Sequence, residues 1–341
     1  MDAFLRRLPK VELHAHLNGS VSRETIRQLL AAHPPDSPLH AEFAEFERQC
    51  SLESFSSFFG LFRFVYAVTG TKAAIRAIAK QVVLDFEADG CTYLELRSTP
   101  RCGTGDLGSK QEYVDACLAG TQDALQELAA RGVAMDVKWI LSLDRRHSLE
   151  AGLDTVDLAV ANMHRGVVGV DLCGDPEVGG FLQLKPAFSK ARAAGLKVTL
   201  HMAEIESQGQ DTIDMLDFGP DRIGHGTFLS GESRDRVIRD AIPIEVCLSS
   251  NVIGMTVPSI EEHHFNHFHF QGHPCVLCTD DRGVFACSLV HEYSLVEKHF
   301  RLSHADMVQL ALKSVDYIFA DNETKQRVRS RIDAFKAAEA L

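Results

Sequence analysis

The amino-acid sequence predicts an α/β protein with the (β/α)8 TIM-barrel fold. Short apolar segments alternate with segments of helical periodicity, and this alternation occurs eight times along the chain. Parallel strands that alternate with helices in this way close into a barrel, which usually takes about 250 residues. The chain has 341 residues, 45% hydrophobic and 24% charged, as in ordinary globular proteins. We therefore expect a single barrel domain over residues 1–341, with additional helices.

The eight expected strands are rich in Val, Ile and Leu on both alternations, which is typical of strands buried on both faces. In chain order they cover residues 11–17, 92–99, 135–145, 167–175, 197–204, 222–226, 242–251 and 274–281. Helical periodicity is clearest in residues 110–130 and 182–194. Gly132 and Gly195 stand where these two helices are expected to end.

Two stretches exceed what a barrel needs. Residues 18–91 have room for a helical insertion after the first strand as well as the first barrel helix. Within them, the Phe-rich segment 55–66 predicts a helix that is buried or covers the barrel mouth. Residues 303–341 predict two closing helices, with D-N-E-T at 321–324 as the turn and N-cap between them.

Charge and cysteine usage restrict the partners and the compartment. The 35 basic and 47 acidic side chains give a net charge of −12, which argues against a nucleic-acid polymer or an anionic membrane as partner. The nine cysteines are scattered among apolar neighbours, as free thiols are in a reducing compartment. We find no export signal and no apolar run of about 18 residues, so we expect a cytoplasmic monomer that binds a small molecule.

Polar residues recur where the expected strands end, and this is the edge at which barrels of this kind build their active sites. The first strand ends in His14 and His16, which are two residues apart and so point to the same side. Later strands add His201, His225, Asp280 and Asp281. A lone histidine in an apolar strand is more often a core residue. Recurrence at one barrel end instead predicts three histidines and a carboxylate around Zn²⁺, with water completing the coordination.

Seven motifs resemble those of the adenosine and AMP deaminase family within the metal-dependent hydrolases. They occur in order between residue 8 and about residue 295: H-A-H-L-N-G-S, L-E-L-R-S-T-P-R, D-L-C-G-D-P, L-H-M-A-E, R-I-G-H-G, C-L-S-S-N and C-T-D-D. Within the family, the chain is most similar to the adenosine deaminase-like N(6)-methyl-AMP deaminases. The resemblance implies zinc-dependent hydrolytic deamination of N(6)-substituted purine nucleoside monophosphates, chiefly of N(6)-methyl-AMP to IMP and methylamine.

The resemblance also implies roles for individual residues. One zinc ion per chain would be held by His14, His16, His201 and Asp280. The catalytic residues would be Glu204 as proton donor, His225 as the group that orients and helps to deprotonate the attacking water, and Asp281 in contact with water and substrate. A carboxylic acid kept protonated by a dry pocket suits the first role, because purine carbon 6 becomes electrophilic when ring nitrogen 1 takes a proton. The alternatives are a solvated loop carboxylate for Glu204 and a support for the neighbouring ligand for Asp281.

Asn18 stands where adenosine deaminases proper carry an acidic residue. An aspartate about 5–6 Å from a phosphate of charge near −2 would repel it by roughly 5 kcal/mol at an effective dielectric of about 20. A neutral Asn18 therefore favours a 5′-monophosphate, and Arg101 could supply a paired guanidinium for the phosphate. The alternatives are a turn or cap residue for Asn18 and a surface charge for Arg101.

Further substrate contacts are implied by the resemblance at His16, Tyr66, Thr99, Pro100, Cys102, Asp144, Gly174 and Asp281. Two of these positions depart from the family pattern as we expect it. Cys102 replaces a second arginine, and Tyr66 replaces a histidine of the insertion. Both changes would weaken contacts to the phosphate or the ribose.

Several other functions remain as alternatives. The nearest are an adenosine deaminase, which converts adenosine to inosine and ammonia, and an AMP deaminase on the same site. A non-catalytic binding protein would be expected to have lost a ligand or Glu204. A two-metal hydrolase of esters or lactams would need a bridging lysine at the end of the fourth strand, which reads D-L-C-G-D instead.

Two histidine- or cysteine-containing segments resemble metal sites but are interpreted differently. P-C-V-L-C at 274–278 and H-A-E at 40–42 together match the zinc signature of cytidine deaminases, yet they are far apart and the cysteines lie in an apolar strand. The histidine-rich segment 263–270 predicts a loop and helix over the barrel mouth, with a second metal site as its alternative.

Overall fold

The computed structural model describes residues 3–48, 62 and 64–341. It confirms the predicted barrel, because eight strands pair in the order β1 to β8 and each neighbouring pair is parallel. The strands are β1 (Lys10–His16), β2 (Cys91–Ser98), β3 (Asp136–Asp144), β4 (Val167–Cys173), β5 (Lys197–Met202), β6 (Arg222–His225), β7 (Ile244–Val246) and β8 (Cys275–Leu277). A bridge between Ala15 and Asp280 joins the end of the β8 segment to β1.

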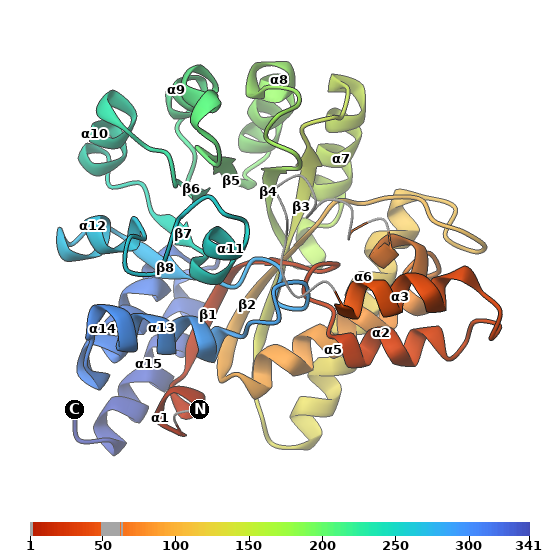
Figure 1. The fold of residues 1–341 in the computed structure, drawn as a ribbon, viewed down its shortest axis with the longest axis horizontal. Coiled ribbons are helices and arrows are strands. Elements are labelled where there is room, and N and C mark those ends of the chain that lie inside the picture. The colour runs from red at the N-terminus through yellow and green to blue at the C-terminus, as the bar shows by residue number, and fades with distance from the viewer. Residues whose placement is uncertain (1–2, 49–61, 63) are drawn as a thin grey trace.

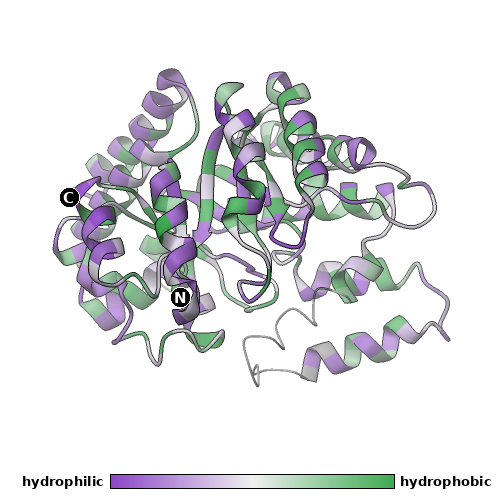
Figure 2. Ribbon diagram, turned by 90° about the horizontal axis from the view of Figure 1, so that it is seen from above, coloured by the Kyte–Doolittle hydropathy of each residue, from purple (hydrophilic) through white to green (hydrophobic). Residues whose placement is uncertain are grey.

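Helices surround the strands in a ring (Figure 1). In chain order they are α1 (Ala3–Arg7), α2 (Arg23–Leu30), α3 (Pro38–Arg48), α5 (Lys72–Ala88), α6 (Lys110–Ala130), α7 (Leu149–Ala161), α8 (Phe181–Ala193), α9 (Gly209–Phe218), α10 (Gly231–Arg239), α11 (Leu248–Ile253), α12 (Phe265–Phe270), α13 (Leu289–Phe300), α14 (His304–Ser314) and α15 (Asn322–Ala338). The insertion helices α2 and α3 project from one side of this ring (Figure 2).

Strand β2 illustrates that the outer face of the barrel sheet is apolar and buried, whereas the inner face carries charged side chains. Leu94 and Leu96 alternate with Glu95 and Arg97, and all four side chains are fully buried. The two leucines belong to the hydrophobic core. Arg97 instead reaches Glu245 on β7, at 2.7 Å between Nη2 and Oε2, although β2 and β7 are not neighbours in the sheet. Side chains such as this one therefore cross the barrel interior, where buried charges are compensated by partners of opposite sign.

The predicted ends of the helices are confirmed at three positions. Gly132 and Gly195 follow α6 and α8 with φ of +73° and +91°, the left-handed conformation in which glycine is favoured. Asp321 caps α15, because its side chain accepts a hydrogen bond from the backbone N–H of Thr324.

The strand prediction was wrong for part of residues 242–251. Strand β7 covers only 244–246, and residues 248–253 form α11 instead. The helical turn directs Ser249 to Glu292 and Ser250 to Asp280, so the polar residues after the apolar run find buried partners that an extended strand would not give them. The Phe-rich segment 55–66 lies largely outside the described residues; residues 62 and 64–68 are helical.

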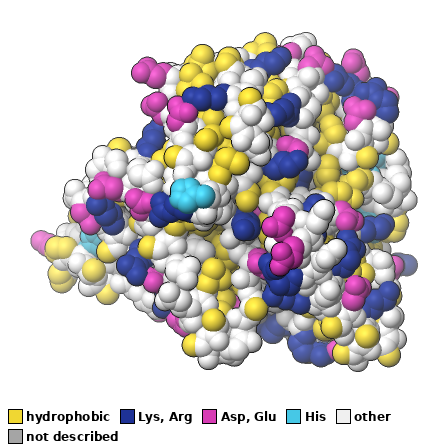
Figure 3. Space-filling view, turned by 180° about the vertical axis from the view of Figure 1, so that it is seen from behind, with side chains coloured by type: hydrophobic (Ala, Val, Ile, Leu, Met, Phe, Trp, Pro, Cys, Tyr) yellow, Lys and Arg dark blue, Asp and Glu magenta, His cyan; other side chains and the backbone are white. Residues whose placement is uncertain are grey.

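Basic and acidic side chains are interspersed on the face opposite to the one seen in Figure 1 (Figure 3). Within residues 3–48, 62 and 64–341, none of the helices combines the length and apolarity needed to cross a bilayer. The eight cysteines of the described part of the chain are free thiols, and seven of them are buried.

Candidate active site

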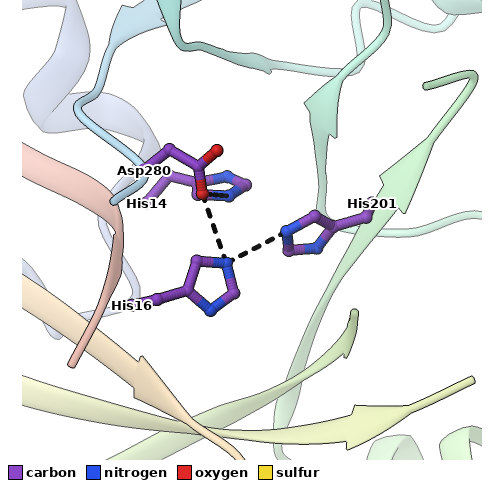
Figure 4. A group of neighbouring side chains, drawn as sticks. All are labelled: His14, His16, His201 and Asp280. Atoms are coloured by element: carbon purple, nitrogen blue, oxygen red, sulfur yellow. Dashed lines mark hydrogen bonds and ion pairs between the residues drawn. The ribbon is translucent and has the colours of Figure 1, made fainter. Parts of the chain in front are cut away.

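The four predicted metal ligands converge at the carboxyl ends of β1, β5 and β8 (Figure 4). Nε2 of His16 lies 3.1 Å from Nε2 of His201, and Oδ1 of Asp280 lies 3.3 Å from Nε2 of His14. Four ligands about 2.0–2.1 Å from one ion are separated by roughly 3.4 Å in a tetrahedron. These side chains are therefore spaced as the ligands of a single ion, and Nε2 of His14 is buried with no hydrogen-bond partner among the described residues.

A second layer of side chains fixes the orientation of these ligands. Nδ1 of His14 lies 2.6 Å from Oε2 of Glu245, and Nδ1 of His201 lies 3.0 Å from Oδ1 of Asp171. Carboxylates in these positions accept a hydrogen bond from Nδ1–H and leave the lone pair of Nε2 free to bind a metal. Ser250 donates a hydrogen bond of 2.7 Å to Oδ2 of Asp280, which leaves Oδ1 facing the histidines.

The backbone at the carboxyl ends of the strands is strained in ways that place these groups. Asp280 and His225 both have φ of +62°, a left-handed conformation that is uncommon for residues other than glycine and concentrates at functional sites. Gly224 packs directly against His14 of the predicted metal ligands, because a Cβ atom there would lie 2.8 Å from Cε1 of His14. The close approach of β6 to β1 thus requires glycine at this position.

The three predicted catalytic residues lie around the same cluster. Glu204 is buried, its Oε1 lies 3.8 Å from Nε2 of His225, and its Oε2 has no hydrogen-bond partner among the described residues. Burial raises the pKa of Glu204 above its ordinary value, so the carboxyl group tends to hold its proton. Oδ1 of Asp281 is also buried without a partner in the described chain. It lies against Gly19, where a Cβ atom would come within 1.5 Å of it.

A cavity of about 340 Å³ opens over this cluster, and it is large enough for a small ligand. Most of the predicted substrate-binding residues line it: His16, Asn18, Tyr66, Thr99, Asp144, Gly174 and Asp281. Pro100, Arg101 and Cys102 are not among its lining residues.

The side chain of Arg101 lies beside the cavity instead of in its wall. Its Nη2 donates hydrogen bonds to the backbone oxygen and to Oγ1 of Thr69, at 3.1 and 2.8 Å. The guanidinium carbon lies 4.7 Å from the ring centre of Tyr66 and 5.0 Å from that of Tyr113. Cys102 is exposed, and its thiol donates a weak hydrogen bond to the carbonyl of Gly108.

Asn18 is a buried residue in the wall of the cavity, and its amide group is held by neutral partners. Its Nδ2 donates to Ser98 and Tyr113 at 3.3 and 3.1 Å, and its Oδ1 accepts from Thr69 at 3.4 Å. The side chain that replaces an acidic residue is therefore uncharged and fixed in position. It connects through Thr69 to Arg101.

Sequence reasoning missed several residues that the structure brings to the site. The most prominent are Arg146, which lines the cavity, and Glu245, Asp171, Ser250 and Asn251, which contact the predicted site residues. Ser250 and Asn251 belong to the motif C-L-S-S-N, and Arg146 follows Asp144 by two positions. Nothing in the local sequence around Glu245 separates it from other buried strand residues.

The histidine-rich segment packs against the site without joining a group of potential metal ligands in the described chain. Nε2 of His264 lies 2.8 Å from the backbone oxygen of His225. Nε2 of His263 lies 3.1 Å from Oδ1 of Asn251, whose amide nitrogen lies 3.3 Å from Nδ1 of His225. This segment therefore supports the carboxyl end of β6, where His225 lies.

Comparison with known proteins places the chain in a family. The sequence pattern of the adenosine deaminase family matches residues 9–335. The chain belongs to this family. It is 43% identical over 336 residues to N6-methyl-AMP deaminase of Danio rerio, a match that covers 96% of this chain and 95% of that protein. Identity to the human N6-methyl-AMP deaminase is 39% over 342 residues, covering 98% and 95%. The chain also matches the crystal structure of Arabidopsis ADAL complexed with IMP. The match covers 100% of both chains at 34% identity, with a TM-score of 0.91.

Proposed function

We propose that the protein hydrolyses N(6)-methyl-AMP to IMP and methylamine, with one zinc ion per chain held by His14, His16, His201 and Asp280. The observation that carries this proposal is the buried carboxyl group of Glu204 beside those ligands, whose Oε2 has no hydrogen-bond partner among the described residues. A protonated acid next to a metal site is the arrangement needed to activate a purine ring towards water. The names of the Danio and human relatives and the IMP complex of Arabidopsis ADAL support the choice of substrate.

The residues of the site divide the proton transfers between them. A divalent metal ion bound to these ligands lowers the pKa of water and so supplies a nucleophile at neutral pH. Glu204 donates its proton to ring nitrogen 1 of the purine, which makes carbon 6 electrophilic. His225 and Asp281 orient the attacking water and accept its proton. The proton taken from water then passes to the amino nitrogen, which leaves as methylamine. The oxygen of water becomes the 6-oxo group, and its remaining proton returns to Glu204.

Zinc is proposed because of the donor set and its spacing. Three imidazole nitrogens and one carboxylate oxygen suit Zn²⁺, and their separations of 3.1 to 3.4 Å fit tetrahedral coordination. Elemental analysis of the purified protein should give one zinc per chain. The second group of potential ligands, His225, Cys247 and Asp280, shares Asp280 with the first and so does not offer an independent site.

A monophosphate is proposed as substrate because the position that would repel it is neutral. Asn18 carries no charge and is held by Ser98 and Tyr113, so a phosphate near it meets no carboxylate from this residue. We further propose that the protein is a cytoplasmic monomer, which the seven buried free thiols among the described residues and the mixed charges on the face seen in Figure 3 support. Sedimentation of the purified protein and imaging of a tagged copy would test these two points.

The decisive experiment compares three substrates. The zinc-loaded protein is incubated with N(6)-methyl-AMP, AMP and adenosine, and the release of methylamine or ammonia is followed. We expect the highest kcat/KM for N(6)-methyl-AMP. Faster turnover of adenosine would overturn the argument from Asn18 and favour an ordinary adenosine deaminase, and faster turnover of AMP would favour an AMP deaminase.

A further inference from the structure

Arg146 follows strand β3 and is a cation in the wall of the active-site cavity. Its guanidinium forms a two-point pair with Asp144, at 2.7 Å from Nε to Oδ1 and 2.6 Å from Nη2 to Oδ2. The side chain of Arg146 is 65% exposed, whereas that of Asp144 is 12% exposed. The arginine is therefore held at the solvent-facing part of the cavity by a largely buried carboxylate.

Two other arginines near the cavity already donate hydrogen bonds through Nη2, although the buried Nη1 atom of each has no hydrogen-bond partner in the described part of the chain. Arg97 is fully buried, and its Nη2 donates to Glu245 and to the backbone oxygen of Leu13. Arg101 donates to Thr69 and does not line the cavity. Among the described residues that line the cavity, Arg146 is thus the one arginine with a mainly exposed side chain.

The pair with Asp144 leaves donors of Arg146 available. A guanidinium carries five N–H groups, and two of them are directed to Asp144. The remaining three have no hydrogen-bond acceptor within the described part of the chain. A phosphate group offers several acceptor oxygens, and arginine binds such groups through two parallel hydrogen bonds.

Gly174 contributes to this arrangement from the neighbouring strand. It follows β4 with φ of +100°, and a Cβ atom there would lie 2.9 Å from Oδ1 of Asp144. The absence of a side chain lets the loop after β4 lie against the carboxylate. Asp144 is thereby confined between Gly174 and Arg146, which restricts the directions in which the guanidinium can point.

We propose that Arg146 binds the 5′-phosphate of the nucleotide and so determines the preference for monophosphates over nucleosides, while Asp144 orients its guanidinium. This inference rests on the proposed function and adds a specificity-determining residue to it. It also changes the interpretation of two residues. Asp144 acts through Arg146, and Arg101 acts as part of the support beneath the cavity.

The test measures binding of IMP and of inosine to Arg146→Gln by calorimetry. IMP and inosine differ only in the phosphate. The dissociation constant of inosine divided by that of IMP therefore isolates the contribution of the phosphate. Loss of charge-assisted hydrogen bonds to the phosphate should weaken IMP binding about 10- to 100-fold and lower this ratio accordingly. Arg146→Lys keeps the charge but loses the paired geometry, so its affinity for IMP should lie between those of the unaltered protein and Arg146→Gln.

Arg239→Gln provides a matched control. Arg239 pairs with Asp240 through the same two atoms, at 2.8 and 2.9 Å, and its side chain is 66% exposed, but it lies at the end of α10 outside the cavity. We expect this variant to bind IMP as the unaltered protein does. The IMP dissociation constant of the unaltered protein should also rise with salt more steeply than that of Arg146→Gln.

The outcomes separate this inference from the proposed function. If the unaltered protein binds IMP no more tightly than inosine, the proposed monophosphate preference fails. If it prefers IMP and Arg146→Gln keeps that preference and its salt dependence, the role of Arg146 is wrong while the proposed function stands. Equal weakening of IMP and inosine would likewise overturn a phosphate contact.

Discussion

Nδ1 of His14 lies 2.6 Å from Oε2 of Glu245, and both side chains are completely buried in the barrel interior. The same carboxylate accepts hydrogen bonds from three residues on other strands, Arg97, Arg222 and Thr199. Opposite charge and hydrogen bonding keep the pKa of Glu245 well below its ordinary value despite its burial, so it stays an acceptor. A proposed ligand of the metal is therefore oriented by a residue that is itself fixed by much of the barrel.

Glu245→Gln should weaken metal binding about 10- to 100-fold, as is common when the partner of a metal-bound histidine is changed. The amide can no longer accept a hydrogen bond at both of its terminal atoms, so the orientation of His14 is lost. Competition with a chelator of known affinity measures the effect. The surface pair of His299 and Glu261, also 2.6 Å apart, supplies the control Glu261→Gln, which should bind metal normally. Unchanged affinity in a folded Glu245→Gln would contradict the proposal.

Glu204→Gln should lower kcat by about 10²- to 10⁴-fold, the usual effect of removing a general acid. An amide has the shape of the carboxylic acid but cannot give up a proton to ring nitrogen 1. Metal content should remain as in the unaltered protein, because Glu204 is not a proposed ligand. Glu206→Gln is the control, since Glu206 is exposed only two residues away. Retained turnover in Glu204→Gln would show that the proton comes from another group.

Gly19→Ala should displace Asp281 and lower turnover at least tenfold. A Cβ atom at residue 19 would lie only 1.5 Å from Oδ1 of Asp281, so the carboxylate has to move out of its position. Overpacking of this kind also costs about 1–3 kcal/mol of stability. Gly209→Ala is the control, because a Cβ atom there meets nothing within 4 Å. Steady-state kinetics and thermal unfolding of both variants test this, and normal activity of Gly19→Ala would refute it.

Glu292 should make the free energy of unfolding fall as the pH rises. Burial raises its pKa from 4.5 to about 8, although Ser249 donates hydrogen bonds to it. Between pH 4.5 and 8 the folded state thus binds a proton that the unfolded state has released, and stability declines by at most about 1.4 kcal/mol per pH unit from this group. Glu292→Gln lacks this contribution. Urea unfolding at several pH values should therefore show that the free energy of unfolding of the variant rises relative to that of the unaltered protein up to about pH 8. Parallel plots of the two free energies against pH would exclude the effect.

Removal of the metal should lower the melting temperature as well as abolish turnover. A ligand that binds only the folded state at 1,000 times its dissociation constant stabilises it by about 4 kcal/mol. Calorimetry before and after chelation measures the shift, and Zn²⁺ should restore both melting and activity where Mg²⁺ does not, because the donors are mainly nitrogen. Activity that survives complete chelation would remove the basis of the proposed mechanism.

The barrel could be predicted from the sequence because its strands are short apolar runs whose ends coincide with polar residues. The same periodicity failed after Val246, where the apolar run continues into a helix. The helix that forms there is held by a hydrogen bond from Ser249 to Glu292, a partner 43 residues away along the chain. Local pattern carries no information about such a partner.

The candidate site was predictable to a similar extent. His14 and His16 lie two residues apart on a strand, so their convergence follows from strand geometry alone. Arg101 remains a predicted phosphate ligand, although its Nη2 donates to Thr69 and its guanidinium lies against the rings of Tyr66 and Tyr113. The direction in which a long side chain points is decided by tertiary neighbours, and the sequence does not reveal these.

The charged interior of the barrel has a consequence for any attempt to give this scaffold a new reaction. Arg222 joins Glu245, which contacts the proposed metal ligand His14, to Glu95 and to the backbone of Tyr317. Replacing one of these charged side chains alone would leave its partners buried and without a compensating charge. Protein design on this scaffold can therefore alter the loops around the cavity. The buried charged side chains of the barrel interior have to be replaced together or left unchanged.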